Sequence, residues 1–192
     1  MLFRSMAVIE PIAQQICDIA GWDYLGADSD TLPSVVGQLL REQGQTLSVA
    51  ESCTGGGLGQ LVTEVSGSSD YFWGGVIAYD NRVKIGLLGV NAADIDEFGA
   101  VSDSVARQMA VGVQQRLGTS WGLSITGIAG PGGGNDSKPV GLVYLGIAAP
   151  DGSVESVECR FGSVRDRQIV RYLSACTALD QLRRKLLLAK VR

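Results

Sequence analysis

Short β-prone segments alternate with segments of helical periodicity along most of this 192-residue chain. Pro150, Asp151 and Gly152 separate the last two β-prone segments, and this turn predicts an antiparallel hairpin. Strands that alternate with helices form a sheet covered by helices on both faces. The sequence therefore predicts a three-layer α/β/α sandwich with a mixed sheet that contains one antiparallel hairpin. The predicted helices cover residues 31–44, 55–65, 81–88, 102–118 and 165–190, and the predicted strands cover 46–50, 73–79, 121–126, 140–148 and 153–161, with 73–79 expected to be buried.

The first 30 residues do not follow this alternation. Their apolar residues have helical spacing over 8–20, and Pro11 is tolerated only in the first turn of such a helix. A polar segment follows, and then Asp30 or Thr31 can cap the first helix of the main domain. The sequence predicts an N-terminal extension at 1–30 and a main domain at 31–192. The apolar residues of the extension are Val8, Ile9, Ile12, Ile16 and Ile19.

The chain contains no histidine. This excludes Ser-His-Asp and Cys-His activation of a nucleophile and any zinc site that uses imidazole. Acid–base chemistry must rely on Lys, Tyr, Cys or carboxylates. The net charge of −4 argues against binding of duplex nucleic acid, since the basic residues cluster only at 183–192, where they complement a helix C-terminus.

The four cysteines show no CxxC spacing, which is typical of a protein from a reducing compartment. No segment reaches the roughly 18 consecutive apolar residues of a membrane span, and the N-terminus lacks a signal-peptide pattern. We expect a cytoplasmic protein without membrane association. The cysteines are Cys17, Cys53, Cys159 and Cys176.

Three loops follow predicted strands, and ligands of open α/β sheets bind at such strand ends. The first loop, residues 50–57, places Ser52, Cys53 and Thr54 directly before glycines that open a helix. Free N–H groups at this position can hold a phosphate or a developing oxyanion. The structural alternative is that Ser52 is a helix cap and the glycines form a tight turn.

The second loop brings Tyr79 and Lys84 to the end of another strand. A lysine acts as a general base only where its environment lowers the pKa from about 10.4 towards 7–8. The absence of histidine favours Lys84 for this role, and a solvated surface lysine is the alternative. Cys53 is a competing nucleophile or an inert buried thiol.

The third loop, residues 126–134, is glycine-rich, which predicts a close approach between its backbone and another group. It matches neither a Walker A motif nor a GxGxxG motif, so it is either a phosphate cradle of N–H groups or a tight crossover loop. Lys138 follows it and adds positive charge to a phosphate or faces water. Arg165, Arg167 and Arg171 open the last predicted helix and are suited to bind a phosphate.

Five segments together resemble the CinA C-terminal domain family, and the resemblance covers about residues 31–190. The family implies an α/β/α domain, often dimeric, that hydrolyses the carboxamide of nicotinamide mononucleotide to nicotinic acid mononucleotide and ammonia. Because the chain has no histidine and no clustered carboxylates, we expect this reaction to need no cofactor or metal. The segments are AESCTGG at 50–56, GSSDYFWGGVIAYDNRVK at 67–84, GAVS at 99–102, TGIAGPGGG at 126–134 and KPVGLVY at 138–144.

The resemblance also implies roles for individual residues. Ser52 is the expected nucleophile, Lys84 the base and Tyr79 a member of the proton network. The family's Gly-Asp-Arg element corresponds imperfectly to residues 165–167, and Arg167 is the arginine expected to meet the phosphate. The remaining substrate-binding residues are expected to be Cys53, Thr54, Gly55, Thr126, Gly127, Gly130 and Lys138.

Two other functions compete with this interpretation. The first is a non-catalytic nucleotide-binding or regulatory module, in which the glycine loops hold a phosphate and Ser52 is a helix cap. Residues 6–45 are similar to the end of the linking domain in longer family members, so the chain is expected to be a fragment or a variant of a two-domain protein. A metal-dependent phosphohydrolase would use Asp80, Asp103 and Asp136, which form no compact cluster in the sequence. A small nicotinamide nucleotide is the expected ligand, a homodimer is expected, and neither nucleic acid nor a membrane is expected as a partner.

Overall fold

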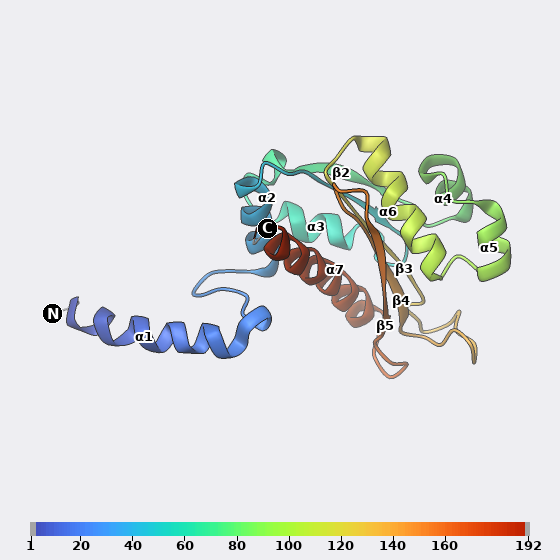
Figure 1. Ribbon diagram of the computed structural model, residues 1–192. Coiled ribbons are helices and arrows are strands. Elements are labelled where there is room, and N and C mark those ends of the chain that lie inside the picture. Colours follow the sequence, from blue (N-terminus) through green and yellow to red (C-terminus); the bar gives the residue numbers. More distant parts are fainter. Residues whose placement is uncertain (1–2, 191–192) are drawn as a thin grey trace.

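The structure, a computed structural model, describes residues 3–190. Its centre is a five-stranded sheet in the order β2-β1-β3-β4-β5 (Figure 1). Strands β2, β1 and β3 are parallel, whereas β4 is antiparallel to both β3 and β5. The predicted mixed sheet and its hairpin are confirmed. The strands are β1 (Leu47–Glu51), β2 (Phe72–Ile77), β3 (Trp121–Gly127), β4 (Leu142–Ala148) and β5 (Val154–Arg160).

Helices cover both faces of the sheet and form two apolar clusters with it (Figure 1). The larger cluster joins one face to α2 (Leu32–Glu42), α3 (Gly57–Thr63) and α7 (Arg167–Lys190). The smaller cluster joins the other face to α4 (Asn81–Leu88), α5 (Ala92–Phe98) and α6 (Asp103–Leu117). The predicted three layers are therefore present. Short 3-10 helices occupy Gly21–Asp23 and Ser68–Asp70.

Helix α6 packs very close to the sheet at two glycines. A Cβ atom at Gly122 would clash with the carbonyl of Ala110, and one at Gly146 would clash with the carbonyl of Ala106. The buried Ser124 Oγ also donates a 2.6 Å hydrogen bond to the Ala106 carbonyl. Backbone-to-backbone contact therefore fixes how α6 lies on the sheet.

Local signals fix the ends of several helices. Thr31 and Ser34 form a capping box at the start of α2, and Ser102 accepts a hydrogen bond from the Val105 N–H at the start of α6. Gly118 ends α6 in the left-handed conformation. Asp80 caps α4 by accepting a hydrogen bond from the N–H of Arg82.

Two predicted elements differ from the structure. The segment predicted as a buried strand at 73–79 is the edge strand β2, whose side chains are alternately exposed, because only β1 pairs with it among residues 3–190. Trp73 and Ile77 are exposed in consequence. The helix predicted from residue 55 begins only at Gly57, since Gly55 and Gly56 have φ values of 57° and 99°. Helix α5 forms in a segment whose sequence pattern is mixed.

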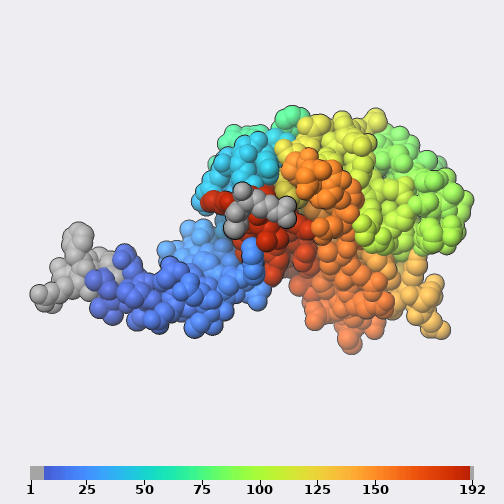
Figure 2. Space-filling view, in the orientation of Figure 1, coloured from blue at the N-terminus to red at the C-terminus, as the bar shows by residue number. Residues whose placement is uncertain are grey.

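The N-terminal helix α1 (Phe3–Ala20) projects away from the rest of the molecule (Figures 1 and 2). It begins earlier than the sequence predicts, so Pro11 lies in the helix interior rather than in the first turn. Its apolar residues from Val8 to Ile19 are 53–87% exposed, because nothing in residues 3–190 covers them. Arg183 of α7 holds the segment that follows by donating to the carbonyls of Trp22 and Tyr24. The division at residue 30 stays a prediction, and residues 1–2 and 191–192 lie outside the described residues.

None of the helices in the described part of the chain combines the length and the apolar character that crossing a membrane requires.

Candidate active site

The parallel strands β2, β1 and β3 run in one direction, so the loops that follow them meet at one edge of the sheet. A cavity of about 260 Å³ lies among these loops and the start of α7. It unites most of the predicted site residues, whereas Thr54, Gly55 and Lys138 are not among its lining residues. The lining comprises Ser52, Cys53, Tyr79, Asn81, Lys84, Ala100, Val101, Thr126, Gly127, Ile128, Ala129, Gly130, Gly132, Gly133 and Arg167.

Lys84 is the best-buried charged group of this cavity, with 2% of its surface exposed. Its Nζ lies 3.3 Å from Ser52 Oγ, 2.8 Å from the carbonyl oxygen of Ala78 and 3.3 Å from that of Tyr79. Burial lowers the pKa of Lys84, an effect that the nearby carboxylate of Asp80 and the Cys53 sulfur partly oppose. The alternative of a solvated surface lysine is therefore wrong.

The three contacts of Lys84 suit both of its protonation states. As an ammonium, it donates one hydrogen bond to each contact. As a neutral amine, it keeps two N–H bonds on the carbonyls of Ala78 and Tyr79 and directs its lone pair at Ser52 Oγ. The backbone thus orients the amine for accepting the proton of Ser52.

Ser52 does not cap the helix that follows it. Gly56 occupies the cap position of α3, and no side-chain hydroxyl caps that helix. The hydroxyl of Ser52 instead contacts Lys84, which favours the chemical interpretation over the structural one.

Cys53 lies next to Ser52 in the lining but is poorly suited to attack a substrate. It is 5% exposed, and burial raises the pKa of its thiol to about 11. Since the thiolate is the reactive form of cysteine, little of it exists near neutral pH. Ser52 is therefore the better candidate nucleophile.

Glu51 holds the loop that carries Ser52, and this role was not predicted from the sequence. Its buried carboxylate accepts hydrogen bonds from the N–H groups of Gly56, Leu58 and Gly59 at 2.8–3.0 Å. The start of α3 is therefore occupied by a side chain of the protein itself. A carboxylate at the end of an apolar strand, followed by a glycine-rich helix start, is the sequence signal that could have revealed it.

The N–H groups left for a ligand are consequently fewer than the sequence suggests. The N–H of Gly55 donates to the carbonyl of Ser52, and the N–H of Gly57 donates to that of Thr54. Within residues 3–190, no carbonyl or carboxylate accepts a hydrogen bond from the N–H groups of Cys53 or Thr54. These two groups are the available oxyanion donors of the loop.

Tyr79 and Arg167 form the outer rim of the cavity. One Nη of Arg167 donates to the carbonyl of Gly130 at 2.9 Å, and the other lies 3.3 Å from the Tyr79 hydroxyl. The Tyr79 side chain is 63% exposed, and only its backbone carbonyl contacts Lys84. No carboxylate in the described residues forms an ion pair with Arg167, so its charge is available to an anion.

The opposite wall is held by hydrogen bonds to the segment between α5 and α6. Thr126 Oγ1 donates to the carbonyl of Ala100 at 2.8 Å. Lys138, expected beside a phosphate, instead donates to the carbonyls of Phe98 and Val101 and anchors this segment. The unpaired carbonyls at the end of α5 attract its ammonium group.

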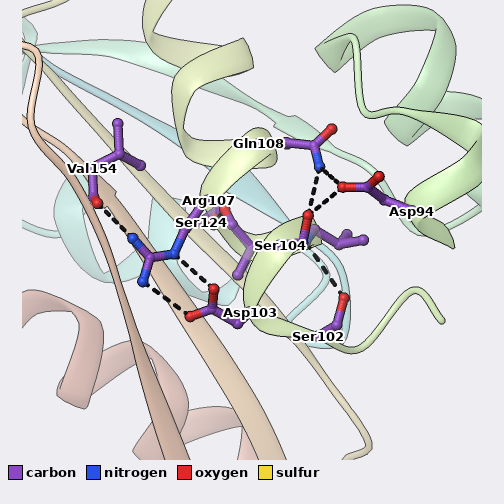
Figure 3. Close-up of polar contacts among 10 residues, drawn as sticks. Asp94, Ser102, Asp103, Ser104, Arg107, Gln108, Ser124 and Val154 are labelled. Carbon is purple, nitrogen blue, oxygen red and sulfur yellow. Dashed lines mark hydrogen bonds and ion pairs between the residues drawn. The ribbon is translucent and has the colours of Figure 1, made fainter. Parts of the chain in front are cut away.

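Side-chain contacts also join the two helices that flank this segment (Figure 3). Asp94 of α5 accepts hydrogen bonds from Ser104 and Gln108 of α6, and Gln108 also donates to Ser104 at 2.8 Å. Arg107 pairs with Asp103 and donates to the Val154 carbonyl of β5. This network stabilises the wall formed by Ala100 and Val101.

Two of the three carboxylates considered for a metal site have other partners. Asp80 pairs with Arg82, which lowers the pKa of Asp80 to about 2, and Asp103 pairs with Arg107. Among residues 3–190, no group of three or more cysteine, aspartate or glutamate side chains is arranged to hold a metal ion.

Comparison with protein families shows a match to the CinA C-terminal domain over residues 29–186. A CinA-like protein of Crocosphaera subtropica is 71% identical over 184 residues, which are 96% of this chain and 44% of that protein. A CinA-like protein of Gloeothece citriformis is 67% identical over 187 residues, which are 97% and 45% of the two chains. The chain thus spans less than half the length of these relatives.

Solved structures show the same fold. The competence/damage-inducible protein CihA of Agrobacterium tumefaciens is 38% identical with a TM-score of 0.75, over 82% of this chain and 96% of that one. A competence-damaged protein (CinA) superfamily protein of Klebsiella pneumoniae is 29% identical with a TM-score of 0.77, over 81% and 96%.

Proposed function

The chain belongs to the CinA C-terminal domain family, and on this premise we propose that it is an amidohydrolase that converts nicotinamide mononucleotide to nicotinic acid mononucleotide and ammonia. The observation that carries the proposal is the contact between Ser52 Oγ and the buried Lys84 Nζ. A serine beside an amine of lowered pKa is a nucleophile with its base, and it needs no imidazole.

The first half of the proposed reaction acylates the enzyme. Ser52 Oγ attacks the carboxamide carbon while neutral Lys84 takes the hydroxyl proton. The N–H groups of Cys53 and Thr54 stabilise the oxyanion of the tetrahedral intermediate. The C–N bond then breaks, and Lys84 gives its proton to the nitrogen that leaves as ammonia.

The second half returns the enzyme to its starting state. A water molecule attacks the acyl carbon while Lys84 accepts its proton. When the bond to Ser52 breaks, Lys84 returns that proton to Ser52 Oγ and nicotinic acid mononucleotide is released. The protein's own groups suffice for both halves, so the scheme uses neither a cofactor nor a metal.

Recognition of the substrate phosphate is assigned to Arg167. Its guanidinium lies at the rim of the cavity, its partners are neutral oxygens, and its fork of donors matches a phosphate. Tyr79 lies beside Arg167, so in this proposal Tyr79 orients the arginine and faces the substrate. The enzyme is expected to act in the cytoplasm and as a homodimer.

Ammonia release from nicotinamide mononucleotide by the purified chain tests this function. Turnover is expected to persist in the presence of a chelator. Binding of the nucleotide without ammonia release would favour a regulatory nucleotide-binding module instead. Loss of turnover on chelation, with recovery on addition of a divalent ion, would refute the Ser-Lys scheme.

A further inference from the structure

The turn that carries Ser52 is held in place at nearly every peptide. The N–H of Ser52 donates to the Ile125 carbonyl of β3 at 2.9 Å, and the Ser52 carbonyl accepts from Gly55 at 3.1 Å. The N–H of Gly56 donates to Glu51 at 3.0 Å. Within residues 3–190, the N–H groups of Cys53 and Thr54 are the ones in this turn that remain for the substrate. The Thr54 N–H lies in the peptide next to the one that carries the Thr54 carbonyl.

Arg171 contacts Thr54 from outside the lining of the cavity. Its Nη2 lies 2.6 Å and its Nε 3.3 Å from the Thr54 carbonyl oxygen, and Thr54 is fully buried. Arg171 follows Arg167 by about one turn of α7, yet it does not line the cavity. No carboxylate in residues 3–190 forms an ion pair with it, so its guanidinium is directed at this carbonyl.

We propose that Arg171 is a positioning residue, which fixes the Thr54 carbonyl so that the N–H groups of Cys53 and Thr54 stay directed at the oxyanion. The proposal rests on the amidohydrolase function proposed above. A guanidinium that donates twice to one carbonyl restrains the peptide between Thr54 and Gly55 more than a single donor does. That peptide directly follows the one that carries the Thr54 N–H, so holding it limits how the Thr54 N–H can turn. Small displacements of oxyanion donors reduce rates steeply, because these bonds strengthen in the transition state.

This role differs from that of Arg167 on the same helix. Arg167 is placed to bind the substrate in its ground state, so its loss affects KM. Arg171 does not line the cavity that holds Ser52 and is proposed to act on a bond that forms in the transition state, so its loss affects kcat. Helix α7 would then supply both the phosphate ligand and the support of the oxyanion donors.

Steady-state ammonia release from nicotinamide mononucleotide tests the assignment with Arg171→Ala and Arg171→Lys. We expect Arg171→Ala to lower kcat about 10–100-fold while KM changes by less than about twofold. Arg171→Lys should retain an intermediate kcat, since an ammonium keeps the charge and one hydrogen bond to the carbonyl. Arg165, which the sequence also indicates as a possible phosphate ligand, is exposed, lies just before α7 and is not among the residues that line the cavity. Arg165→Ala is therefore the matched control and should behave as wild type.

A second measurement separates positioning from general loss of structure. In an aldehyde analogue of the substrate, –CHO replaces the carboxamide; Ser52 Oγ adds to its carbonyl carbon, and the hydroxyl proton passes to the new oxygen. The affinity for this analogue should fall in Arg171→Ala by the same factor as kcat. The intact amide, in contrast, should bind with equal affinity to Ser52→Ala and to the double variant that combines Ser52→Ala with Arg171→Ala.

The outcomes distinguish the two proposals. If the wild type releases no ammonia, the amidohydrolase function fails and the role of Arg171 fails with it. If the wild type is active and Arg171→Ala keeps its kcat, only the role of Arg171 is refuted. A fall in kcat without a matching loss of aldehyde affinity also refutes it. Should Arg171→Ala fail to fold, a wild-type kcat in folded Arg171→Lys, together with unchanged aldehyde affinity, would count against positioning.

Discussion

Lys84 Nζ lies 3.3 Å from Ser52 Oγ, although the two residues are 32 positions apart and come from helix α4 and from the turn after β1. If one proton relay joins them, removing either should cost nearly the whole catalytic factor. Ser52→Ala, Lys84→Ala and the double variant should therefore share one residual rate, about 10³-fold or more below wild type. Ammonia release measures the rates, and circular dichroism checks the fold. Additive losses in the double variant would contradict a shared relay.

The lowered pKa of Lys84 predicts how activity changes with pH. The neutral amine is the base, so kcat/KM should rise as pH increases through the lowered pKa and level off below the ordinary value of 10.5. Cys53→Ala should keep the same rising limb, because the raised pKa of about 11 keeps that thiol protonated. If the rise of kcat/KM with pH disappeared in Cys53→Ala, the nucleophile would be the thiol of Cys53.

The same pKa shift predicts a change in stability. Between the lowered folded-state pKa and 10.5, the unfolded chain binds more protons at Lys84 than the folded chain does. This residue's contribution to the free energy of unfolding should therefore increase with pH across that interval. Denaturant titrations of wild type and Lys84→Met at several pH values measure this contribution. The destabilisation of the wild type relative to Lys84→Met should be largest below the folded-state pKa.

Arg167→Ala should weaken recognition of the phosphate. We expect KM for nicotinamide mononucleotide to rise about 10–100-fold, while KM for nicotinamide riboside, which lacks the phosphate, changes little. Ammonia release from both substrates by Arg167→Ala and by the control Arg165→Ala measures the difference. An equal rise in KM for both substrates would contradict the assignment of Arg167 to the phosphate.

Glu51→Gln should destabilise the protein by about 2–3 kcal/mol, since an amide replaces the carboxylate that accepts three backbone N–H bonds in a buried position. Glu64→Gln is the control, because Glu64 is exposed at the other end of α3, and we expect a change within about 0.5 kcal/mol. Urea denaturation measures both. If Glu51→Gln left the free energy of unfolding unchanged, the start of α3 would not need the carboxylate.

The sequence predicts the elements of the fold well where their signals are local. Ser102 caps α6 and Gly118 ends it because each acts within a few residues, and the turn at 150–152 lies between two strands that pair directly. The position of β2 at the sheet edge could not be predicted, since strand order depends on which segments meet in space. For the same reason, the exposure of the apolar residues of α1 was not evident from their helical spacing.

The site shows the same division between local and distant determinants. Ser52, Tyr79 and Lys84 follow strands whose ends share one edge, so their convergence on one cavity could be predicted. The partners of Lys138 could not, because it reaches back to carbonyls about 40 positions earlier in the chain. Which N–H groups near Ser52 are available depends on where the Glu51 side chain folds, and spacing alone does not show this.

The close packing of α6 at Gly122 and Gly146 has a consequence for how this domain can change during evolution. Ala100 and Val101 line the cavity and directly precede α6, so any residue that lifts the helix from the sheet also moves that wall. A single methyl group at Gly146, which does not line the cavity, would then alter the width of the cavity. Selection on substrate fit would then act on the interior of the sheet as strongly as on the loops.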